Sequence, residues 1–349
     1  MWLWKGELAM EMKTLFSTVS QWLRQGENVV LAAIIADSGS TPRGAGARMA
    51  IASSGSLVGT IGGGALEFRV QQMALEVLEN KKSGSKSFAL RPDDKEGLGM
   101  MCGGDVTVCI QYISSQDDQA HKIFAYGAGL FDKNIDTWFI TDITGEAEWR
   151  MGICTRDSCI GIEPGLMREK SLFTNKGVLI EISGRRYFSE PLTRAGKVYI
   201  FGGGHISQEL LPLLSHLGFN CVLFDNLAEF TSKELFPDAD SIILGDFNDI
   251  GTQVNITEKD YVIIMTRGHS FDYAVQLQAL ARMPLYIGVI GSKKKMGDVS
   301  QKLIEHGFSR EDIARIHSPI GIAIKADTPS EIAVSIAAEL ILVRANTFT

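Results

Sequence analysis

The chain has 349 residues and a formal net charge of −7, and this acidic balance argues against non-specific binding of nucleic acid. Hydrophobic residues make up 45% and charged residues 21% of the sequence, which is typical of a globular protein with material for about two domains. Apolar runs such as Val29–Ala36 are too short to cross a bilayer. Lys5 and Glu7 interrupt the apolar start of the chain, so a signal peptide is not expected.

The first half of the chain predicts a mixed α+β domain, assigned to residues 12–190. Periodic apolar positions favour helices, and short apolar runs bounded by glycine or serine favour strands. The predicted elements are a helix over 12–26, strands over 29–36, 47–52 and 57–61, a helix over 65–80, and strands over 88–90 and 106–112. Residues 117–185 predict one helix followed by irregular strands, and no chemistry is assigned to them.

Three consecutive glycines, Gly62, Gly63 and Gly64, precede the helix predicted from residue 65, and Glu67 lies in its first turn. Because the first N–H groups of a helix attract anions, this turn is a candidate anion site. The alternative is that the glycines only allow the hairpin to pack tightly on the helix. Residue type alone favours that alternative.

Five cysteines are present, and their odd number and irregular spacing argue for a reducing cytoplasm and against disulfide bonds. Cys154 and Cys159 have no nearby histidine, so a zinc site is not expected there. Cys109 and Cys221 are interpreted as inert core residues. Cys102 is followed by two glycines that leave a thiol accessible, which makes it a candidate metal ligand or sulfur acceptor. The alternative for Cys102 is a further core cysteine.

After a polar link at 191–197 the pattern alternates between strands and helices. This alternation predicts a Rossmann-like, doubly wound parallel sheet over residues 197–345. Its predicted strands are 198–201, 221–224, 241–244, 261–265 and 285–290. The last helix has a clear start signal in Thr328, Pro329 and Glu331.

The first of these strands runs into Gly202 and Gly204, a helix opens at His205, and the second strand ends in Asp225. This is the order of a dinucleotide-binding βαβ unit, in which the glycines admit a phosphate and the acid holds a ribose hydroxyl. Ser207 replaces the third glycine of that fingerprint. The alternative is a Rossmann domain that binds another phosphorylated ligand, or none.

Two further loops are expected at the same edge, because the carboxyl ends of parallel strands lie together. Arg267 and His269 follow the fourth strand, with His269 as a proton carrier or hydrogen-bond donor, or as a structural loop residue. The fifth strand is followed by a helix start that predicts an anion clamp. The residues of this clamp are Gly291, Ser292 and Lys293.

Together these segments resemble the xanthine dehydrogenase accessory protein family (XdhC/CoxI). The resemblance spans residues 29–344 in the family's order. It is carried by GSTPR at 39–43, GARM at 46–49, GTIGGGALE at 59–67, MCGG at 101–104, FGGGH at 201–205, YIGVIGSK at 286–293, PIG at 319–321 and TPSEIAVSIAAE at 328–339. Two positions depart from the pattern: Arg267, where the family often has a histidine, and Asn226, where an arginine is common.

The resemblance implies a chaperone that binds the molybdenum cofactor, as molybdopterin or its dinucleotide form, and protects it. It further implies sulfuration of that cofactor by a cysteine desulfurase and insertion into an apo molybdenum hydroxylase of the xanthine dehydrogenase type. The family's cysteine maps onto Cys102, which would contact molybdenum through the cofactor. A homodimer without turnover of its own is expected. As a hypothesis, the cofactor's phosphate rests on Gly202–Ser207 and Gly291–Lys293, and its molybdenum faces Cys102 and Gly62–Gly64.

Two other hypotheses stay open. One is an NAD(P)-dependent oxidoreductase that uses the Rossmann half, with His269 and Asp272 near the hydride path. The other is a redox or persulfide relay based on Cys102. The sequence predicts a cytoplasmic protein that binds neither nucleic acid nor membrane.

Overall fold

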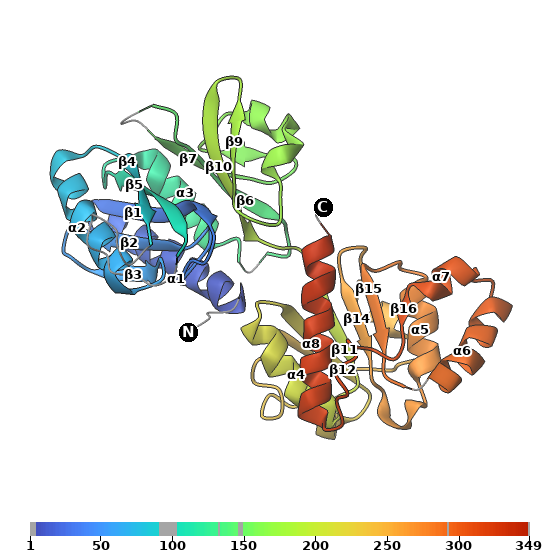
Figure 1. Cartoon of the computed structure of the whole chain (residues 1–349). Coiled ribbons are helices and arrows are strands. Elements are labelled where there is room, and N and C mark those ends of the chain that lie inside the picture. The colour runs from blue at the N-terminus through green and yellow to red at the C-terminus, as the bar shows by residue number, and fades with distance from the viewer. Residues whose placement is uncertain (1–4, 91–102, 132, 146–148, 292, 348–349) are drawn as a thin grey trace. The chain divides into compact units, whose positions relative to one another are not determined.

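The computed structural model describes residues 5–90, 103–131, 133–145, 149–291 and 293–347, and the side chains of residues 5–11, 269 and 293–296 are outside that description. The chain divides into two compact units that meet in sequence between Arg194 and Ala195 (Figure 1). Unit 1 contains two antiparallel five-stranded sheets, called sheet A and sheet B. Unit 2 contains one six-stranded parallel sheet.

Sheet A has the strand order β3-β2-β1-β5-β4 and is covered by helices on both faces. α2 packs on one face through Leu66 and Val70, and α1 and α3 pack on the other through Phe16 and Phe124. The central strand β1 is therefore buried on both sides, which explains its continuous apolar run. The elements are α1 Lys5–Arg24, β1 Val29–Ser38, β2 Arg48–Ala52, β3 Leu57–Thr60, α2 Gly64–Asn80, β4 Gly84–Ala89, β5 Asp105–Ile113 and α3 Asp118–Ala128.

Sheet B has the order β8-β7-β6-β10-β9, where the sequence predicts only irregular strands. Every residue of β6 is buried, so its sequence shows no alternation of polar and apolar positions. Its strands are β6 Thr137–Asp142, β7 Arg150–Cys154, β8 Cys159–Ile160, β9 Val178–Ile182 and β10 Arg185–Thr193. Because β10 continues through Pro191 to Thr193, the connection to unit 2 is shorter than the polar link expected from the sequence.

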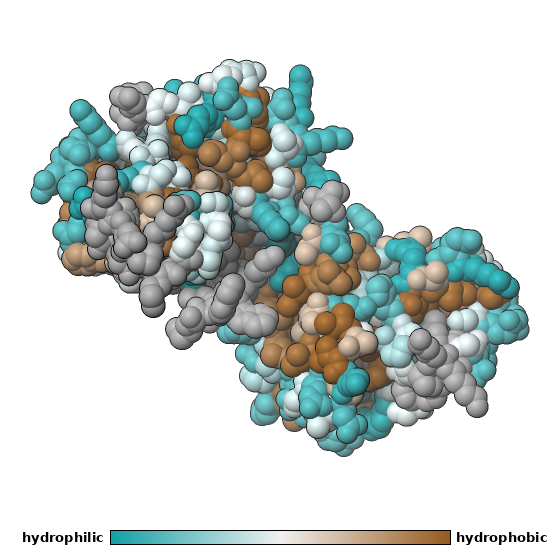
Figure 2. Space-filling model, in the orientation of Figure 1, coloured by the Kyte–Doolittle hydropathy of each residue, from teal (hydrophilic) through white to brown (hydrophobic). Residues whose placement is uncertain are grey.

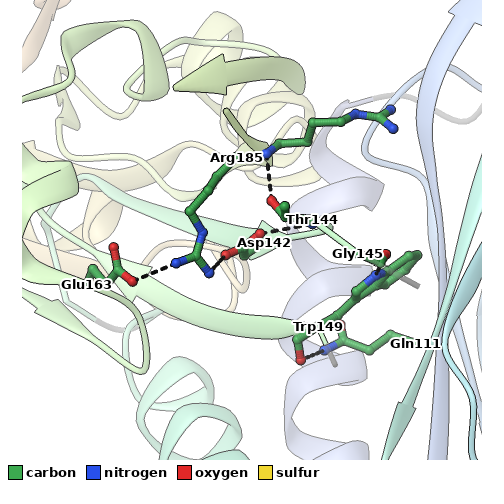
Figure 3. Close-up of polar contacts among 8 residues, drawn as sticks. Gln111, Asp142, Thr144, Gly145, Trp149, Glu163 and Arg185 are labelled. Atoms are coloured by element: carbon green, nitrogen blue, oxygen red, sulfur yellow. Dashed lines mark hydrogen bonds and ion pairs between the residues drawn. The ribbon is translucent and has the colours of Figure 1, made fainter. Parts of the chain in front are cut away.

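Polar contacts between described residues join the sheets of unit 1. Arg48 of β2 forms an ion pair with Glu190 of β10, and only 1% and 5% of these side chains are exposed. The Arg48 guanidinium also lies 4.7 Å from the centre of the Phe139 ring. Gln111 of β5 donates a hydrogen bond of 3.3 Å to the carbonyl of Trp149 (Figure 3).

A partly exposed polar network closes one end of sheet B (Figure 3). Asp142, at the end of β6, accepts hydrogen bonds from Arg185 and, at 2.9 Å, from the N–H of Thr144. Arg185 also pairs with Glu163 at 2.9 Å. The hydrogen bond to Asp142 raises the pKa of the Arg185 guanidinium. Since the Arg185 side chain is 39% exposed, the network orders this turn but contributes little stability.

Cys154 and Cys159 form a disulfide, so the prediction of no disulfides is wrong. The two residues end β7 and begin β8, and they lie directly opposite each other with 4.1 Å between their Cα atoms. Opposed positions on antiparallel strands come this close in the pairs that exchange no hydrogen bonds. The bond follows from the strand register, which a count of cysteines cannot reveal.

The parallel sheet of unit 2 has the order β13-β12-β11-β14-β15-β16 and confirms the predicted Rossmann-like domain. α4 and α8 cover one face, and α5 and α6 cover the other. The predicted strands are all present, and the two-residue strand β16 was missed. The elements are β11 Lys197–Phe201, α4 His205–His216, β12 Asn220–Asp225, β13 Ser241–Leu244, β14 Tyr261–Ile264, α5 Asp272–Leu280, β15 Tyr286–Val289, α6 Lys293–Glu305, α7 Arg310–Ala314, β16 Ile316–His317 and α8 Pro329–Asn346.

The last helix, α8, begins as predicted, with Thr328 and Glu331 forming a reciprocal capping box. Its buried side packs against α4, but its outward side is also apolar. Val334 and Leu342 are 51% and 54% exposed, and Figure 2 shows hydrophobic residues gathered over this helix. No helix among the described residues, α8 included, is both long enough and apolar enough to cross a membrane.

Candidate functional site

Three glycine-containing segments lie together at one edge of sheet A. A Cβ added to Gly62 would lie 2.9 Å from the Cβ of Pro42, and one added to Gly39 would lie 3.1 Å from the Cα of Gly104. The antiparallel order of the sheet causes this, because β1 and β3 end at the edge where β5 begins. We call these segments, residues 39–43, 61–64 and 103–104, the glycine cluster.

Glu67, in the first turn of α2, holds the glycine cluster's central turn. Its Oε2 accepts hydrogen bonds from the Thr60 hydroxyl, from the N–H of Ile61 at 3.0 Å and from the N–H of Gly63 at 3.1 Å. Thr60 in turn accepts from the N–H of Gly62 at 3.0 Å. Because a carboxylate already takes these donors, the turn differs from the bare anion site expected from the sequence.

The cluster keeps a surface that carries no side chains. A Cβ added to Gly63, Gly64 or Gly103 would have no described atom within 4 Å. A ligand can therefore approach the backbone closely at these positions. Cys102 directly precedes Gly103 in the sequence but lies outside the described residues, so its role stays a prediction.

In unit 2 the strand order reverses between β11 and β14, and the loops after β11, β12 and β14 meet there. A Cβ on Gly202 would lie 3.2 Å from the Cα of Thr266, and one on Gly203 would lie 2.9 Å from the Cβ of Phe230. The guanidinium of Arg267 lies 4.1 Å from the centre of the Phe230 ring. Open α/β sheets bind their ligands at such a reversal.

Asp225, at the end of β12, holds the glycine turn of unit 2. Its Oδ2 accepts from the N–H of Gly203 at 2.7 Å, and its Oδ1 accepts from the N–H of Leu227 at 3.0 Å. Ser207 is buried and donates a hydrogen bond to the carbonyl of Gly202, so it fills the third fingerprint position tightly. Both oxygens of Asp225 thus accept hydrogen bonds from backbone N–H groups, and its contact with a ribose stays a prediction.

Gly204 and His205 are exposed at the start of α4. A Cβ on Gly204 would have no described atom within 4 Å, and as the N-cap residue Gly204 brings no side chain to cap the helix. The first N–H groups of α4 are therefore the donors in this turn that remain suited to an anion.

The other predicted residues of this edge are placed only in part. Arg267 is 56% exposed and pairs with Glu229 at 3.8 Å. Gly291 follows β15 with a φ of 150°. The predicted residues outside the description are Ser292 as a whole and the side chains of His269 and Lys293. Their part in the site stays a prediction.

Asp272, which the oxidoreductase hypothesis places near the hydride path, is buried beneath the loop after β14. Its Oδ1 accepts from the N–H of Thr266 at 3.1 Å and from the Thr266 hydroxyl. The carboxylate therefore positions this loop, and its burial does not favour proton exchange with a ligand.

A further polar cluster lies where α8 covers β15 and β16. Oε2 of Glu339 accepts from the Tyr286 hydroxyl and from the N–H of Gly321, both at 2.6 Å, and Oε1 lies 2.7 Å from Nδ1 of His317. Burial alone would raise the pKa of Glu339, but the hydrogen bonds from His317, Tyr286 and Gly321 outweigh it and lower this pKa. The cluster ties the PIG motif to the last helix and is structural.

Within the described residues, no group of three or more His, Cys, Asp or Glu side chains is arranged to hold a metal ion. Cys109 and Cys221 are buried core cysteines, as predicted. Burial raises the pKa of Cys109 to about 11 and raises that of Cys221 as well. Both thiols therefore stay protonated and unreactive at neutral pH.

Sequence reasoning missed Glu229 and Phe230, which lie in a short 3-10 helix, Ala228–Phe230, after β12. They meet Arg267 only because β12 and β14 flank β11 in the sheet. No spacing or periodicity signals this contact. The acceptor role of Glu67 had a signal, since an acid in the first turn of a helix can reach back to the N–H groups just before that helix.

Two family models match the chain. One, the XdhC and CoxI family, matches residues 22–89, and the other, the XdhC Rossmann domain, matches residues 198–340. Together they cover more than half of the chain, including both glycine turns. The chain belongs to the XdhC and CoxI family. The resemblance inferred from the sequence is thereby confirmed.

Curated relatives match over nearly the whole chain. The uncharacterized protein YqeB of Escherichia coli is 24% identical over 95% of this chain, which spans only 46% of that protein's length. A probable xanthine dehydrogenase subunit of Bacillus subtilis is 24% identical over 92% of this chain and 95% of its own. The molybdenum cofactor insertion chaperone PaoD of E. coli is 23% identical over 95% of this chain and 88% of its own.

A solved structure supports the fold. The crystal structure of a protein described as a xanthine dehydrogenase from Bacillus halodurans superposes with a TM-score of 0.74 at 23% identity. The match covers 94% of this chain and 95% of that one. At this identity the likeness establishes the fold alone.

Proposed function

We propose that this protein carries the molybdenum cofactor and inserts it into an apo molybdenum hydroxylase of the xanthine dehydrogenase type. The observation that carries the proposal is the glycine cluster, where Gly63, Gly64 and Gly103 leave the backbone open beside the position of Cys102 in the sequence. A carrier needs a surface that a flat, reactive ligand can approach closely. The name of PaoD, a related insertion chaperone, supports the same function.

In this proposal the glycine cluster and Cys102 serve the ring and metal end of the cofactor, as molybdopterin or its dinucleotide form. A cysteine desulfurase supplies the sulfur while the cofactor is held, and Cys102 contacts the molybdenum through the cofactor. Within unit 2 taken by itself, the start of α4, with Gly204 and His205, is suited to a phosphate group, because its first N–H groups have no side-chain cap. Arg267 adds positive charge at the same edge of the parallel sheet.

Anaerobic ultrafiltration tests the carrier role. Purified protein is mixed with released molybdenum cofactor, and the retained pterin is measured by fluorescence after oxidation. Retention of about one pterin per chain is expected for a single site, together with loss of retention in Cys102→Ala. Cys221→Ala is the matched control, because that thiol is buried in unit 2 and should not affect retention. Equal retention by Cys102→Ala would refute the assigned role of this cysteine.

We also propose a homodimer, supported by the apolar outward side of α8. Val334 and Leu342 share this side with the half-buried Ala338 and Ile341, and a monomer leaves it in contact with water. Multi-angle light scattering of the wild type should give twice the chain mass. Leu342→Lys should give the mass of one chain, and a dimer of unchanged stability in this variant would place the interface elsewhere.

One observation favours a second candidate, an NAD(P)-dependent oxidoreductase. The strand order of unit 2 is that of a complete dinucleotide-binding fold. If this candidate is right, the protein should bind reduced nicotinamide, and the fluorescence of the nicotinamide should change on binding. Retention of the molybdenum cofactor without nicotinamide binding decides against it.

A further inference from the structure

We infer that Glu67 is the residue through which the glycine cluster selects the uncharged, N–H-bearing edge of a ring over an anionic group. The inference starts from an asymmetry in its carboxylate. Oε2 takes all three hydrogen bonds from Thr60, Ile61 and Gly63, whereas Oε1 takes none from the described residues. A carboxylate has about four acceptor sites on its two oxygens, and the three donors of the turn all crowd onto one of them. One oxygen therefore builds the turn, and the other is left for a ligand.

The same carboxylate disfavours an anion at this turn. A phosphate bound to the first N–H groups of α2 would lie within a few ångströms of Glu67, and like charges at that distance repel strongly in a half-buried site. The N–H groups of Ile61 and Gly63 are also already engaged. Two N–H groups of the turn are thus taken by Glu67, and its charge removes the potential that a phosphate needs.

A flat ring with adjacent N–H donors has the complementary chemistry. The 2-amino-4-oxopyrimidine edge of a pterin presents an amino group and a ring N–H side by side, and a carboxylate accepts such donors strongly. The open backbone at Gly63 and Gly64 gives the ring a surface free of side chains. Glu67 is then a specificity-determining residue for the ring.

The inference rests on the proposed function, which names the pterin, and the substitution that tests it leaves the turn intact. In Glu67→Gln the amide oxygen can replace Oε2 and keep the three hydrogen bonds of the turn. The amide NH2 then stands in place of Oε1, so an acceptor becomes a donor. Glu76→Gln is the matched control: it removes the same charge from an exposed position of α2. That position lies about 13 Å further along the helix axis, beyond the screening length at physiological salt.

The experiment is a fluorescence titration of the full chain with 6-hydroxymethylpterin and with 6-hydroxymethyllumazine, in which an oxo group replaces the 2-amino group. The wild type and Glu76→Gln should prefer the pterin by about tenfold, near the value of one hydrogen bond to a charged group. Glu67→Gln should lose or invert this preference without a change in melting temperature. Inorganic phosphate should not displace the pterin from the wild type.

Three results would overturn the inference: an unchanged preference in Glu67→Gln, displacement of the pterin by phosphate, or no binding of the pterin by the wild type. None of them decides the carrier role, because retention of the intact molybdenum cofactor is measured separately. Conversely, a wild type that discriminates pterin from lumazine but does not retain the cofactor refutes the carrier role and keeps Glu67 as a determinant of ring binding.

Discussion

Replacing Arg48 by methionine should destabilise unit 1 strongly, because it leaves Glu190 as a buried carboxylate without its partner. The two side chains are 1% and 5% exposed, and the guanidinium also stacks on Phe139. Breaking a pair buried to this degree costs about 3–5 kcal/mol. For a unit of this size that corresponds to a fall of roughly 10 °C in melting temperature.

Tryptophan fluorescence can follow this unit, because the three tryptophans among the described residues, Trp22, Trp138 and Trp149, all belong to it. Trp138 is fully buried in sheet B, and its ring centre lies 4.9 Å from that of Phe173, so its emission changes when unit 1 unfolds. Urea titrations followed by this signal give the stability of Arg48→Met, of Glu190→Leu and of the double variant. The double variant should recover most of the loss, because it removes both charges.

Arg185→Met is the comparison variant, since it also removes an arginine from a carboxylate that is 4% exposed, Asp142, but this arginine is itself 39% exposed and Asp142 keeps its hydrogen bond from the N–H of Thr144. Its cost should be clearly smaller than that of Arg48→Met, because water screens the exposed arginine. The reasoning fails if Arg48→Met costs no more than this comparison variant, or if the double variant is as unstable as the less stable single variant.

The pH dependence of the same variant follows from Glu190. Burial raises the pKa of this carboxyl, and in the wild type Arg48 opposes the rise through its charge and hydrogen bond. Without Arg48 the folded pKa lies further above the unfolded value of about 4.5. A raised folded pKa favours the folded state at low pH and loses that benefit as the pH rises. The stability gap between wild type and Arg48→Met should therefore narrow as the pH falls from 7 towards 4.5.

Gly203→Ala should destabilise unit 2 by about 1–3 kcal/mol, since its Cβ would meet the backbone and side chain of the loop after β12, as calorimetry can show. Gly204→Val should cost no more than about 1 kcal/mol and should weaken the binding of pyrophosphate in isothermal titration; equal affinity would make the glycine turn purely structural. Cys109 and Cys221 should resist alkylation by iodoacetamide at pH 7, because burial raises the pKa of both thiols. Mass spectrometry of the treated native protein measures this, and alkylation of either residue would contradict it. The wild type should have a higher free energy of unfolding than Glu339→Gln, with the full difference above pH 4.5 and a smaller one below it, since the folded pKa of Glu339 is lowered. A difference that stays constant in urea titrations across a pH series would contradict this.

The regular parts of the fold were predictable because each has a local signal. Strands buried on both faces appear as apolar runs, and the start of α8 is encoded in Thr328, Pro329 and Glu331. Sheet B was not predictable in the same way. β6 is buried throughout and β8 has two residues, so neither shows a period. The disulfide depends on the register of these strands, which is a property of the folded sheet.

The site was predictable as a set of loops but not as a set of contacts. Gly62–Gly64 and Gly202–Gly204 were identified from their glycines and the helices that follow. The hydrogen bonds of Glu67 and Asp225 were not foreseen, because a glycine motif does not say which acceptor takes its N–H groups. The Arg267–Phe230 stack depends on strand order in the sheet, which no local pattern encodes.

The two glycine turns look alike in sequence, but their carboxylates give them opposite preferences. Each oxygen of Asp225 accepts a hydrogen bond from the backbone, one from the N–H of Gly203 and the other from the N–H of Leu227. The helix that follows this turn, α4, has no side-chain cap. Glu67 engages the turn through one oxygen only and keeps a charged acceptor beside open backbone. At Gly64 an anion would meet a charged oxygen that no described donor engages, whereas at Gly204 both oxygens of the neighbouring carboxylate already accept backbone N–H groups. A ring rich in N–H groups has the reverse preference. If Glu67→Gln makes phosphate a competitor for the pterin while Gly204→Val weakens pyrophosphate binding, this difference in acceptors, and not the number of glycines, determines what each turn binds.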